Sequence, residues 1–347
     1  MNDKIPRMIS GNALVGDDLT LLQVEITIEQ GIITAIDESN KVHDLWICPA
    51  FFNAHTHLGD TVGMDGVLSG DLESLVTPPH GFKHRLLATT PQKEIMKAIR
   101  SSAYLMVRRG CAGCADFREG GISGVSVFRQ AVKNLPFQPL IFGRDGGEKT
   151  AEGLGISSIR DVPDIERIVS DAKGSGKLVA FHAGEKDDRD IEAALSYDPD
   201  LIIHATHASD TELKQCADHN IPIAICPQSN WILSVTQSRN NPPVQRMLDI
   251  GCRIFLGTDN AMFVQPDMLA EMTFLHTVYR IDPENAIRMA VGASTLLKEP
   301  FFIKKGAHAN FFILNPRRSN LLFSKNIAAS IVKRGFSIGS CKNVFNS

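Results

Sequence analysis

Six residues of the types that bind metals or carry protons lie at or just after the ends of short apolar runs. They are His55, His57, His182, Glu185, His204 and Asp259. Three imidazoles and one carboxylate suffice to hold a divalent metal ion and to leave one coordination position open for water. Since a bound metal lowers the pKa of such a water from about 15.7 toward 7, the leading hypothesis is metal-assisted hydrolysis.

The spacing of His55 and His57 is a weak signal alone, because two histidines two residues apart are common by chance. In an extended strand, however, both side chains point to the same side and can reach one ion. His182 and His204 also follow apolar runs, and Asp259 follows a Gly-Thr pair. A single histidine is more simply explained as a hydrogen-bonded core or surface residue, but five such placements in order favour a shared site.

Apolar runs alternate with helix-like segments through the middle of the chain, which is the pattern of βα units and a parallel sheet. The predicted strands are residues 46–54, 113–117, 139–143, 153–159, 177–182, 201–204, 221–226 and 253–257. Apolar residues recur at helical spacing in 93–108 and 162–172, which predicts two of the intervening helices. Eight such units predict an α/β fold of the (β/α)8 TIM barrel type, whose catalytic groups gather at the carboxyl ends of its strands.

The two ends of the chain also carry strand-like segments. Residues 24–36 alternate as two short strands around a Glu-Gln-Gly turn, and residues 309–316 and 327–332 are predicted strands near the other end. We therefore expect a small β-sandwich lobe formed from both termini. The expected division is lobe for 1–47, metal-dependent hydrolase barrel for 48–303 and lobe again for 304–347.

The segment 58–91, between the first predicted strand and its helix, is rich in glycine, proline and charge and is longer than an ordinary connection. Such a loop at the catalytic face is typical of a lid or a substrate-binding segment. It contains Lys83 and His84, which are candidates for recognising an anionic or polar substrate group. A solvated lid with no contact to substrate is an equally good interpretation.

Three more candidates for substrate binding follow predicted strands. Arg118 and Arg144 lie after the second and third strands, where an arginine could hold a carboxylate or phosphate through two hydrogen bonds. Each could instead be neutralised by a neighbouring acid, Glu119 or Asp145. Asn260 could hydrogen-bond a ring nitrogen, although capping of a helix explains it equally well.

The composition is that of an ordinary globular protein, with 347 residues, 43% hydrophobic and 22% charged. A net charge of -3 provides no general attraction to nucleic acid or to anionic lipid. The N-terminus lacks the features of a secretory signal, and no apolar run approaches the length of a membrane span. We therefore expect a cytoplasmic protein with a small-molecule substrate and neither nucleic-acid nor membrane partners; a homo-oligomer is left open.

The seven cysteines are odd in number and scattered, which argues against a disulfide framework. Cys111 and Cys114 have the spacing of half a zinc ribbon, but the sequence offers no second pair. Because they fall within a predicted strand, we expect them to pack in the core.

Five segments together resemble the successive signatures of the amidohydrolase superfamily. They are PAFFNAHTHL at 49–58, HAGE at 182–185, His204, CPQSN at 226–230 and GTD at 257–259. Within the superfamily they are similar to the mononuclear aminohydrolase branch, which includes guanine, cytosine and S-adenosylhomocysteine deaminases and the triazine hydrolases. The HAGE segment also resembles adenosine deaminases, and the resemblance extends from the first β segment to the last.

The resemblance implies that His55, His57, His182 and Asp259 bind one metal ion. The predicted fourth strand contains no lysine, and the nearest, Lys149, lies in a glycine-rich polar stretch. The bridging carbamylated lysine of dinuclear relatives is therefore not expected. Zinc suits an imidazole-rich site with one carboxylate, and iron fits the same ligands.

The resemblance also implies roles in proton transfer. Asp259 would accept the proton of the attacking water, Glu185 would shuttle it to the leaving group, and His204 would orient the nucleophile. His207 is the alternative to His204, but the family's histidine lies directly at a strand end.

The expected reaction is hydrolytic deamination of a nucleobase-like or other nitrogen-heterocyclic amine, with release of ammonia. Hydrolysis of a cyclic amide, as in imidazolonepropionases, is an alternative because it uses a similar set of residues. A non-catalytic, metal-containing barrel that binds a ligand is an alternative of another class. Glu185 and His204 argue against that last interpretation, since a structural metal site needs neither.

Overall fold

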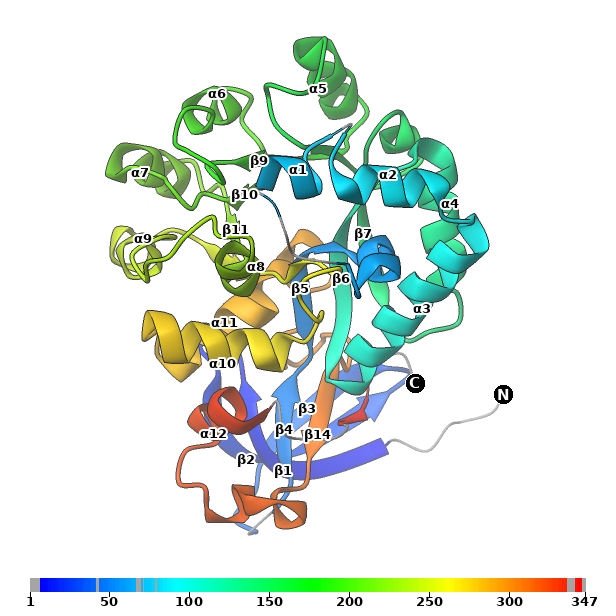
Figure 1. Cartoon of the computed structure of the whole chain (residues 1–347). Coiled ribbons are helices and arrows are strands. Elements are labelled where there is room, and N and C mark those ends of the chain that lie inside the picture. Colours follow the sequence, from blue (N-terminus) through cyan, green and yellow to red (C-terminus); the bar gives the residue numbers. More distant parts are fainter. Residues whose placement is uncertain are drawn as a thin grey trace.

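A parallel barrel surrounded by helices stands on a smaller lobe of strands (Figure 1). The structure is a computed structural model that describes residues 7–41, 44–66, 70, 72–78, 80–335 and 341–344. The strands of the barrel are, in chain order, β5 (Phe51–His57), β6 (Cys111–Arg118), β7 (Gln138–Gly143), β8 (Gly153–Ile156), β9 (Leu178–Ala183), β10 (Leu201–His204), β11 (Ile223–Ile225), β12 (Ile254–Leu256) and β13 (Asp259–Asn260).

The last two strand segments close the barrel. β12 pairs with β11, whereas β13 pairs with β5, and both pairings are parallel. Only Gly257 and Thr258 separate the two segments; the amide of Gly257 bonds to the Ile225 carbonyl and that of Thr258 to the His55 carbonyl. β12 and β13 thus act as one eighth strand, and the predicted (β/α)8 barrel is confirmed.

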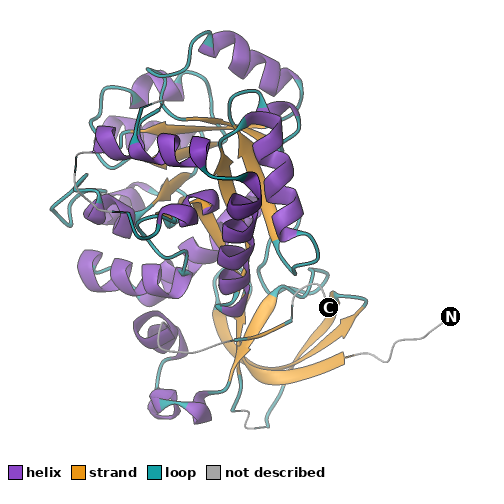
Figure 2. Ribbon diagram, turned by 45° about the vertical axis from the view of Figure 1, so that its right-hand side comes forward, coloured by secondary structure: helices purple, strands orange, loops and turns teal. Residues whose placement is uncertain are grey.

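Helices connect the barrel strands and cover the outside of the sheet (Figures 1 and 2). The predicted helices at 93–108 and 162–172 correspond to α3 (Gln92–Arg108) and α5 (Ile165–Gly174). The other helices of the barrel are α4 (Gly121–Val132), α6 (Ile191–Leu195), α7 (Asp210–Asp218), α8 (Pro227–Ile232), α9 (Val244–Ile250), α10 (Met268–Tyr279) and α11 (Pro283–Gly292). Among the described residues, no helix has both the length and the apolar character needed to cross a bilayer.

The described residues of the segment 58–91 form three short helices. They are the 3-10 helix η1 (Leu58–Gly63), α1 (Leu72–Val76) and α2 (Phe82–Thr89). α1 and α2 lie at the end of the barrel opposite to the lobe (Figure 1). The segment is therefore at the face where the carboxyl ends of the strands open.

Both termini contribute to the lobe, as predicted. Its described strands form one six-stranded sheet in the order β15-β14-β4-β1-β2-β3. Their bounds are β1 (Arg7–Val15), β2 (Thr20–Glu29), β3 (Ile32–Glu38), β4 (Trp46–Pro49), β14 (Phe311–Leu314) and β15 (Lys342–Asn343). The lobe has its own apolar core, which includes Val24, Ile26 and Phe311.

The predicted strand at 327–332 is wrong, because this segment forms the helix α12 (Ile327–Arg334). Its buried residues, Ala328, Ile331 and Val332, recur at the helical spacing of three and four. Asn326 caps the helix by accepting a hydrogen bond from the amide of Ala329. α12 packs against α10 and α11, so part of the C-terminal segment lies on the barrel.

Cys111 and Cys114 are both buried in β6, where their side chains pack in the main core. All seven cysteines are free.

Candidate active site

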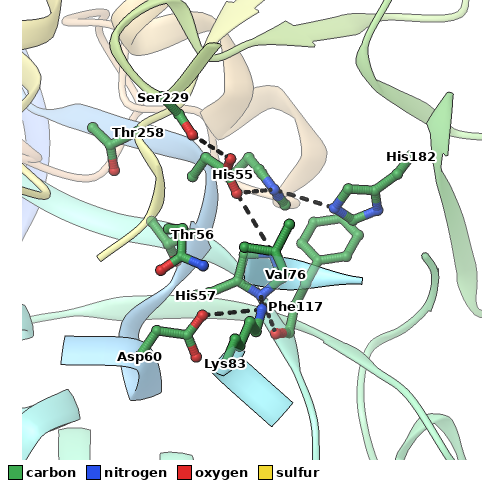
Figure 3. Close-up of polar contacts among 12 residues, drawn as sticks. His55, Thr56, His57, Asp60, Val76, Lys83, Phe117, His182, Ser229 and Thr258 are labelled. Carbon is green, nitrogen blue, oxygen red and sulfur yellow. Dashed lines mark hydrogen bonds and ion pairs between the residues drawn. The ribbon is translucent and has the colours of Figure 1, made fainter. Parts of the chain in front are cut away.

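His55, His57 and His182 converge at the open end of the barrel (Figure 3), and Asp259 lies among them. His55 Nε2 lies 3.0 Å from Asp259 Oδ1 and 3.2 Å from His182 Nε2. His57 Nε2 lies 3.6 Å from the same oxygen of Asp259. All four side chains are buried, although they come from three strands, β5, β9 and β13. Their ligating atoms thus face one common point.

Neighbouring groups orient these side chains. His182 Nδ1 donates to the carbonyl of Ile156 at 2.8 Å, which puts the lone pair on Nε2 at the common point; Arg144 Nη2 lies 3.4 Å from the same Nε2. Ser229 Oγ donates to Asp259 Oδ2 at 2.6 Å and so fixes that carboxylate with Oδ1 toward the histidines. Such outer partners set the tautomer of a metal-binding histidine and the orientation of a metal-binding carboxylate.

The backbone takes an unusual form where two of the functional strands end. His204 has a φ of 77° and Asp259 a φ of 60°, in the left-handed region that residues other than glycine rarely adopt. Such strain persists only where the surrounding structure enforces it, and it is concentrated at functional sites. The backbone at residue 257 packs closely against that of His55. Only glycine fits there, since a Cβ at this position would lie 2.8 Å from the His55 backbone nitrogen.

The electrostatic environment makes the histidines neutral and the aspartate charged. Burial lowers the pKa of His55 to about 4 and holds the pKa values of His57 and His182 well below 6.5. Burial would raise the pKa of Asp259, but contact with His55 and the other imidazoles outweighs it and holds this pKa well below 3.8. Neutral imidazole and ionised carboxylate are the forms that bind a metal.

The donor set therefore fits a divalent metal ion. Two overlapping groups each offer three ligand atoms within 4.8 Å of one another: His55 with His57 and His182, and His55 with His204 and Asp259. Four of these five residues are the ligands implied by the sequence resemblance. β8 and the two residues after it contain no lysine.

Glu185 and His204 lie beside this group on the cavity side. Glu185 Oε2 is 3.6 Å from His204 Nε2, and the Glu185 side chain is 21% exposed. Burial raises the pKa of Glu185; His204 opposes this effect, and the charge of Asp259 adds to it. A carboxyl group with a raised pKa is suited to donate a proton. His207 lies outside the residues that line this cavity.

A cavity of about 260 Å³ opens directly onto these groups. Its wall includes His57, His182, Glu185, His204 and Asp259. The segment 58–91 contributes side chains on the facing wall, among them Leu72, Val76 and Lys83. The segment 58–91 thus lines the cavity at the catalytic face, where the sequence predicted it to lie.

The five substrate-binding candidates divide between two cavities. Lys83, Arg144 and Asn260 line the cavity at the metal-binding group. His84 and Arg118 line a separate cavity of about 330 Å³. Arg118 is paired with Glu119 at 2.7 Å, which is the neutralisation considered from sequence. Asn260 accepts a hydrogen bond from the amide of Met262, as in a local turn.

Several further buried residues at this site have no role predicted from the sequence. Asp60 and Asp116 lie behind His57, and burial raises the pKa of Asp60 to about 7 and that of Asp116 to about 6. Burial also acts on Glu119, but Lys83, His57 and Arg118 outweigh it and hold the pKa of Glu119 well below 4.5. The signal for Ser229 was present in the CPQSN segment, whereas Asp60 carried no pattern that pointed to the site.

Comparison with known proteins agrees with this geometry. Residues 46–333 match the Amidohydrolase family, so the chain belongs to that family and is a hydrolytic enzyme of it. A putative aminohydrolase of Methanothermobacter thermautotrophicus is 31% identical over 375 residues, covering 93% of this chain and 97% of the relative. A 5-methylthioadenosine/S-adenosylhomocysteine deaminase of Thermococcus onnurineus is 24% identical over 395 residues, covering 93% and 88%.

The fold also occurs in solved structures. An adenosine deaminase from Xanthomonas campestris with bound zinc superposes with a TM-score of 0.78 at 15% identity, covering 94% of this chain and 88% of that one. At this level of identity the similarity concerns the fold. The resemblance to the amidohydrolase superfamily, stated from sequence, is confirmed.

Proposed function

We propose that this protein is a metal-dependent hydrolytic deaminase of a nucleobase-like or other nitrogen-heterocyclic amine. The observation that carries the proposal is the placement of Glu185 and His204, 3.6 Å apart, on the cavity side of a buried His55–His57–His182–Asp259 group. A site that only bound a metal would need neither residue. The names of the aminohydrolase and deaminase relatives support the same class of reaction.

His55, His57, His182 and Asp259 would hold the ion, and zinc suits this set best, with iron as the alternative. When bound, the ion supplies activation of water for attack at neutral pH. Asp259 is placed to accept the proton of that water while Ser229 holds its second carboxylate oxygen. His204, the last residue of β10, would hydrogen-bond the nucleophile.

Glu185 completes the proton transfer. Attack on a carbon that bears an amino group gives a tetrahedral centre, whose nitrogen must be protonated before ammonia can leave. Glu185 lines the cavity, and burial raises its pKa, so it can carry a proton to the ring or to the leaving nitrogen. A non-ligand glutamate does the same work in zinc deaminases of other folds.

Arg144 and Asn260 are the substrate-binding residues of this proposal, because they line the same cavity. Lys83 lines it too, but its ammonium group is paired with Glu119 and Asp60, and the residue is left out of the proposal. Arg144 has an unused hydrogen-bond donor in the described part of the chain. Its Nε is buried without a hydrogen-bond partner among the described residues, and its side chain is 10% exposed. His84 and Arg118 line the other cavity and are left out of the proposal.

The test is a panel of aminopurines, aminopyrimidines and aminopterins assayed for ammonia release by zinc-loaded protein. Ammonia release from at least one compound, lost in Glu185→Gln, supports the proposal. A parallel panel of cyclic amides distinguishes the alternative hydrolase: ring opening there, with no ammonia from any amine, would replace the deaminase by a cyclic amide hydrolase. Inactivity of fully metal-loaded protein on both panels would favour the non-catalytic interpretation.

A further inference from the structure

The Nδ1 side of His57 is enclosed by two groups at the end of β6 and by one group of α2. Nδ1 lies 3.0 Å from the carbonyl oxygen of Phe117 in β6 and 3.1 Å from Glu119 Oε1, just beyond that strand. The ammonium group of Lys83, which belongs to α2, lies 2.9 Å from the same nitrogen. Figure 3 shows Lys83 and Phe117 converging on His57 with Asp60 beside them.

These contacts favour one position of the imidazole proton. The Phe117 carbonyl oxygen and the ionised Glu119 carboxylate can only accept hydrogen bonds and favour a proton on Nδ1 of His57, whereas the Lys83 ammonium alone favours the other tautomer. With the proton on Nδ1, the Nε2 of His57 keeps a free lone pair on the side of Asp259. A metal-binding histidine needs this tautomer. Lys83 donates elsewhere, to Glu119 Oε1 at 2.7 Å and to Asp60 Oδ2 at 3.0 Å.

Glu119 is held in place from three directions. Besides Lys83, Arg118 Nη2 lies 2.7 Å from its Oε2, and Arg144 Nη1 lies 3.3 Å from its Oε1. The Glu119 side chain is 9% exposed, and those of Lys83 and Arg118 are 3% exposed. A buried carboxylate among three cations is fixed in both charge and direction.

We propose that Glu119 is a positioning residue of the metal centre, which holds the Nδ1 proton of His57 so that Nε2 faces the ion. Lys83, which belongs to α2 in the segment 58–91, holds Glu119 in position. We call Glu119 and Lys83 together the support of His57. The inference rests on the proposed function only in requiring that the site binds a metal. It does not depend on which substrate is used.

The experiment compares the zinc affinity of purified variants by competition with a chromophoric chelator. Glu119→Gln keeps the shape of the side chain but removes the carboxylate, and we expect zinc affinity to fall about 10- to 100-fold. Lys83→Met should lower it by a smaller factor, because Arg118 and Arg144 still hold Glu119. An unchanged affinity in Lys83→Met would remove Lys83 from the support.

Asp267→Asn is the matched control. It breaks another buried ion pair, in which Arg109 Nε and Nη2 each lie 2.9 Å from Asp267 Oδ2, but it keeps the cap on Leu269. Zinc affinity in this control should stay within about twofold of the unsubstituted protein. If folded Glu119→Gln also binds zinc within twofold, the proposal is overturned.

A second measurement needs no substitution of Glu119. The ring nitrogens of His57 in the zinc-loaded protein can be observed by long-range proton–nitrogen NMR after specific labelling of histidine, with assignment from a His57→Asn sample. A proton on Nδ1 supports the proposal, and a proton on Nε2 overturns it. Tight zinc binding without ammonia release would contradict the deaminase function and leave this inference intact.

Discussion

The two sides of the candidate metal centre are built differently. On the cavity side, Glu185 is 21% exposed and lies 3.6 Å from His204, which is too far for a strong hydrogen bond. The closed side is the Nδ1 side of His57. There, Glu119 and Lys83 are 9% and 3% exposed and lie 2.7 Å apart. A group that transfers protons needs room for substrate and freedom to change charge. A group that only orients a metal-binding histidine needs neither. In our proposals the first task belongs to Glu185 and the second to Glu119.

The largest effect is expected from Glu185→Gln on the cavity side. The amide cannot carry a proton, so kcat should fall about 10²- to 10⁴-fold. Bound zinc per chain, measured by elemental analysis, should not change, because Glu185 is outside the ligand group. Unchanged turnover would remove Glu185 from the mechanism, and lost zinc would mean that the two sides are not separate.

Lys83→Met on the closed side should act on stability. It leaves Glu119 and Asp60 without the ammonium that both contact, and breaking a buried ion pair costs about 3 to 5 kcal/mol. The measurement is the free energy of unfolding from denaturant titration of the metal-free protein. Lys41→Met is the control, since Lys41 is 79% exposed and lies 3.6 Å from Glu25. The comparison fails if both variants unfold at the same denaturant concentration.

Ser229→Ala tests a contact that lies between the two sides. The variant removes the hydrogen bond to Asp259 Oδ2 and leaves Oδ1 in place. Loss of such an outer partner typically costs 10- to 100-fold in metal affinity or activity, and we expect about 10-fold in zinc affinity. Ser229→Thr keeps the hydroxyl and should retain most of the affinity. Equal affinities in both variants would show that the hydroxyl has no such role.

Glu271 is a buried glutamate that contrasts with Glu119. Its described hydrogen-bond donors are the backbone and side-chain nitrogens of Gln228, and burial raises its pKa from 4.5 to about 8. The folded state thus holds this proton more tightly than the unfolded state, so stability is lost as pH rises through that range. The loss between pH 6 and pH 8 should be about 2 kcal/mol.

Glu271→Gln tests this prediction, because glutamine cannot ionise. Its unfolding free energy, measured at several pH values from 6 to 8, should decline less steeply than that of the unsubstituted protein. Parallel declines in the two proteins would mean that Glu271 does not titrate in this range.

The barrel and the convergence of its histidines at one end could be predicted from sequence because both leave local patterns. His55 and His57 lie in an apolar strand, and His182 and His204 end two others, so alternation and strand order are enough to place them. The helix at 327–332 was missed because its run of Ile, Ala and Val fits a buried strand as well as a helix. The cap that Asn326 provides and the packing of the segment on α10 decide for the helix.

The support behind His57 could not be predicted in the same way. Glu119 is a sequence neighbour that can neutralise Arg118, which the structure shows, but its contact with His57 joins the residue just after β6 to the last residue of β5. Lys83 was considered only as a group that faces substrate. Its ammonium group contacts Asp60 of η1 because α2 packs against η1, and this packing leaves no periodic signal in the sequence.

The seam of the barrel has a consequence for unfolding. β5 is the first strand and β13 belongs to the last, and His55, His57 and Asp259 lie on either side of their junction. A divalent ion held there would cross-link residues about 200 positions apart along the chain, as a disulfide would, but reversibly. Chelation should therefore lower the melting temperature of the entire barrel in one cooperative step, because a ligand bound only by the closed form stabilises all of it.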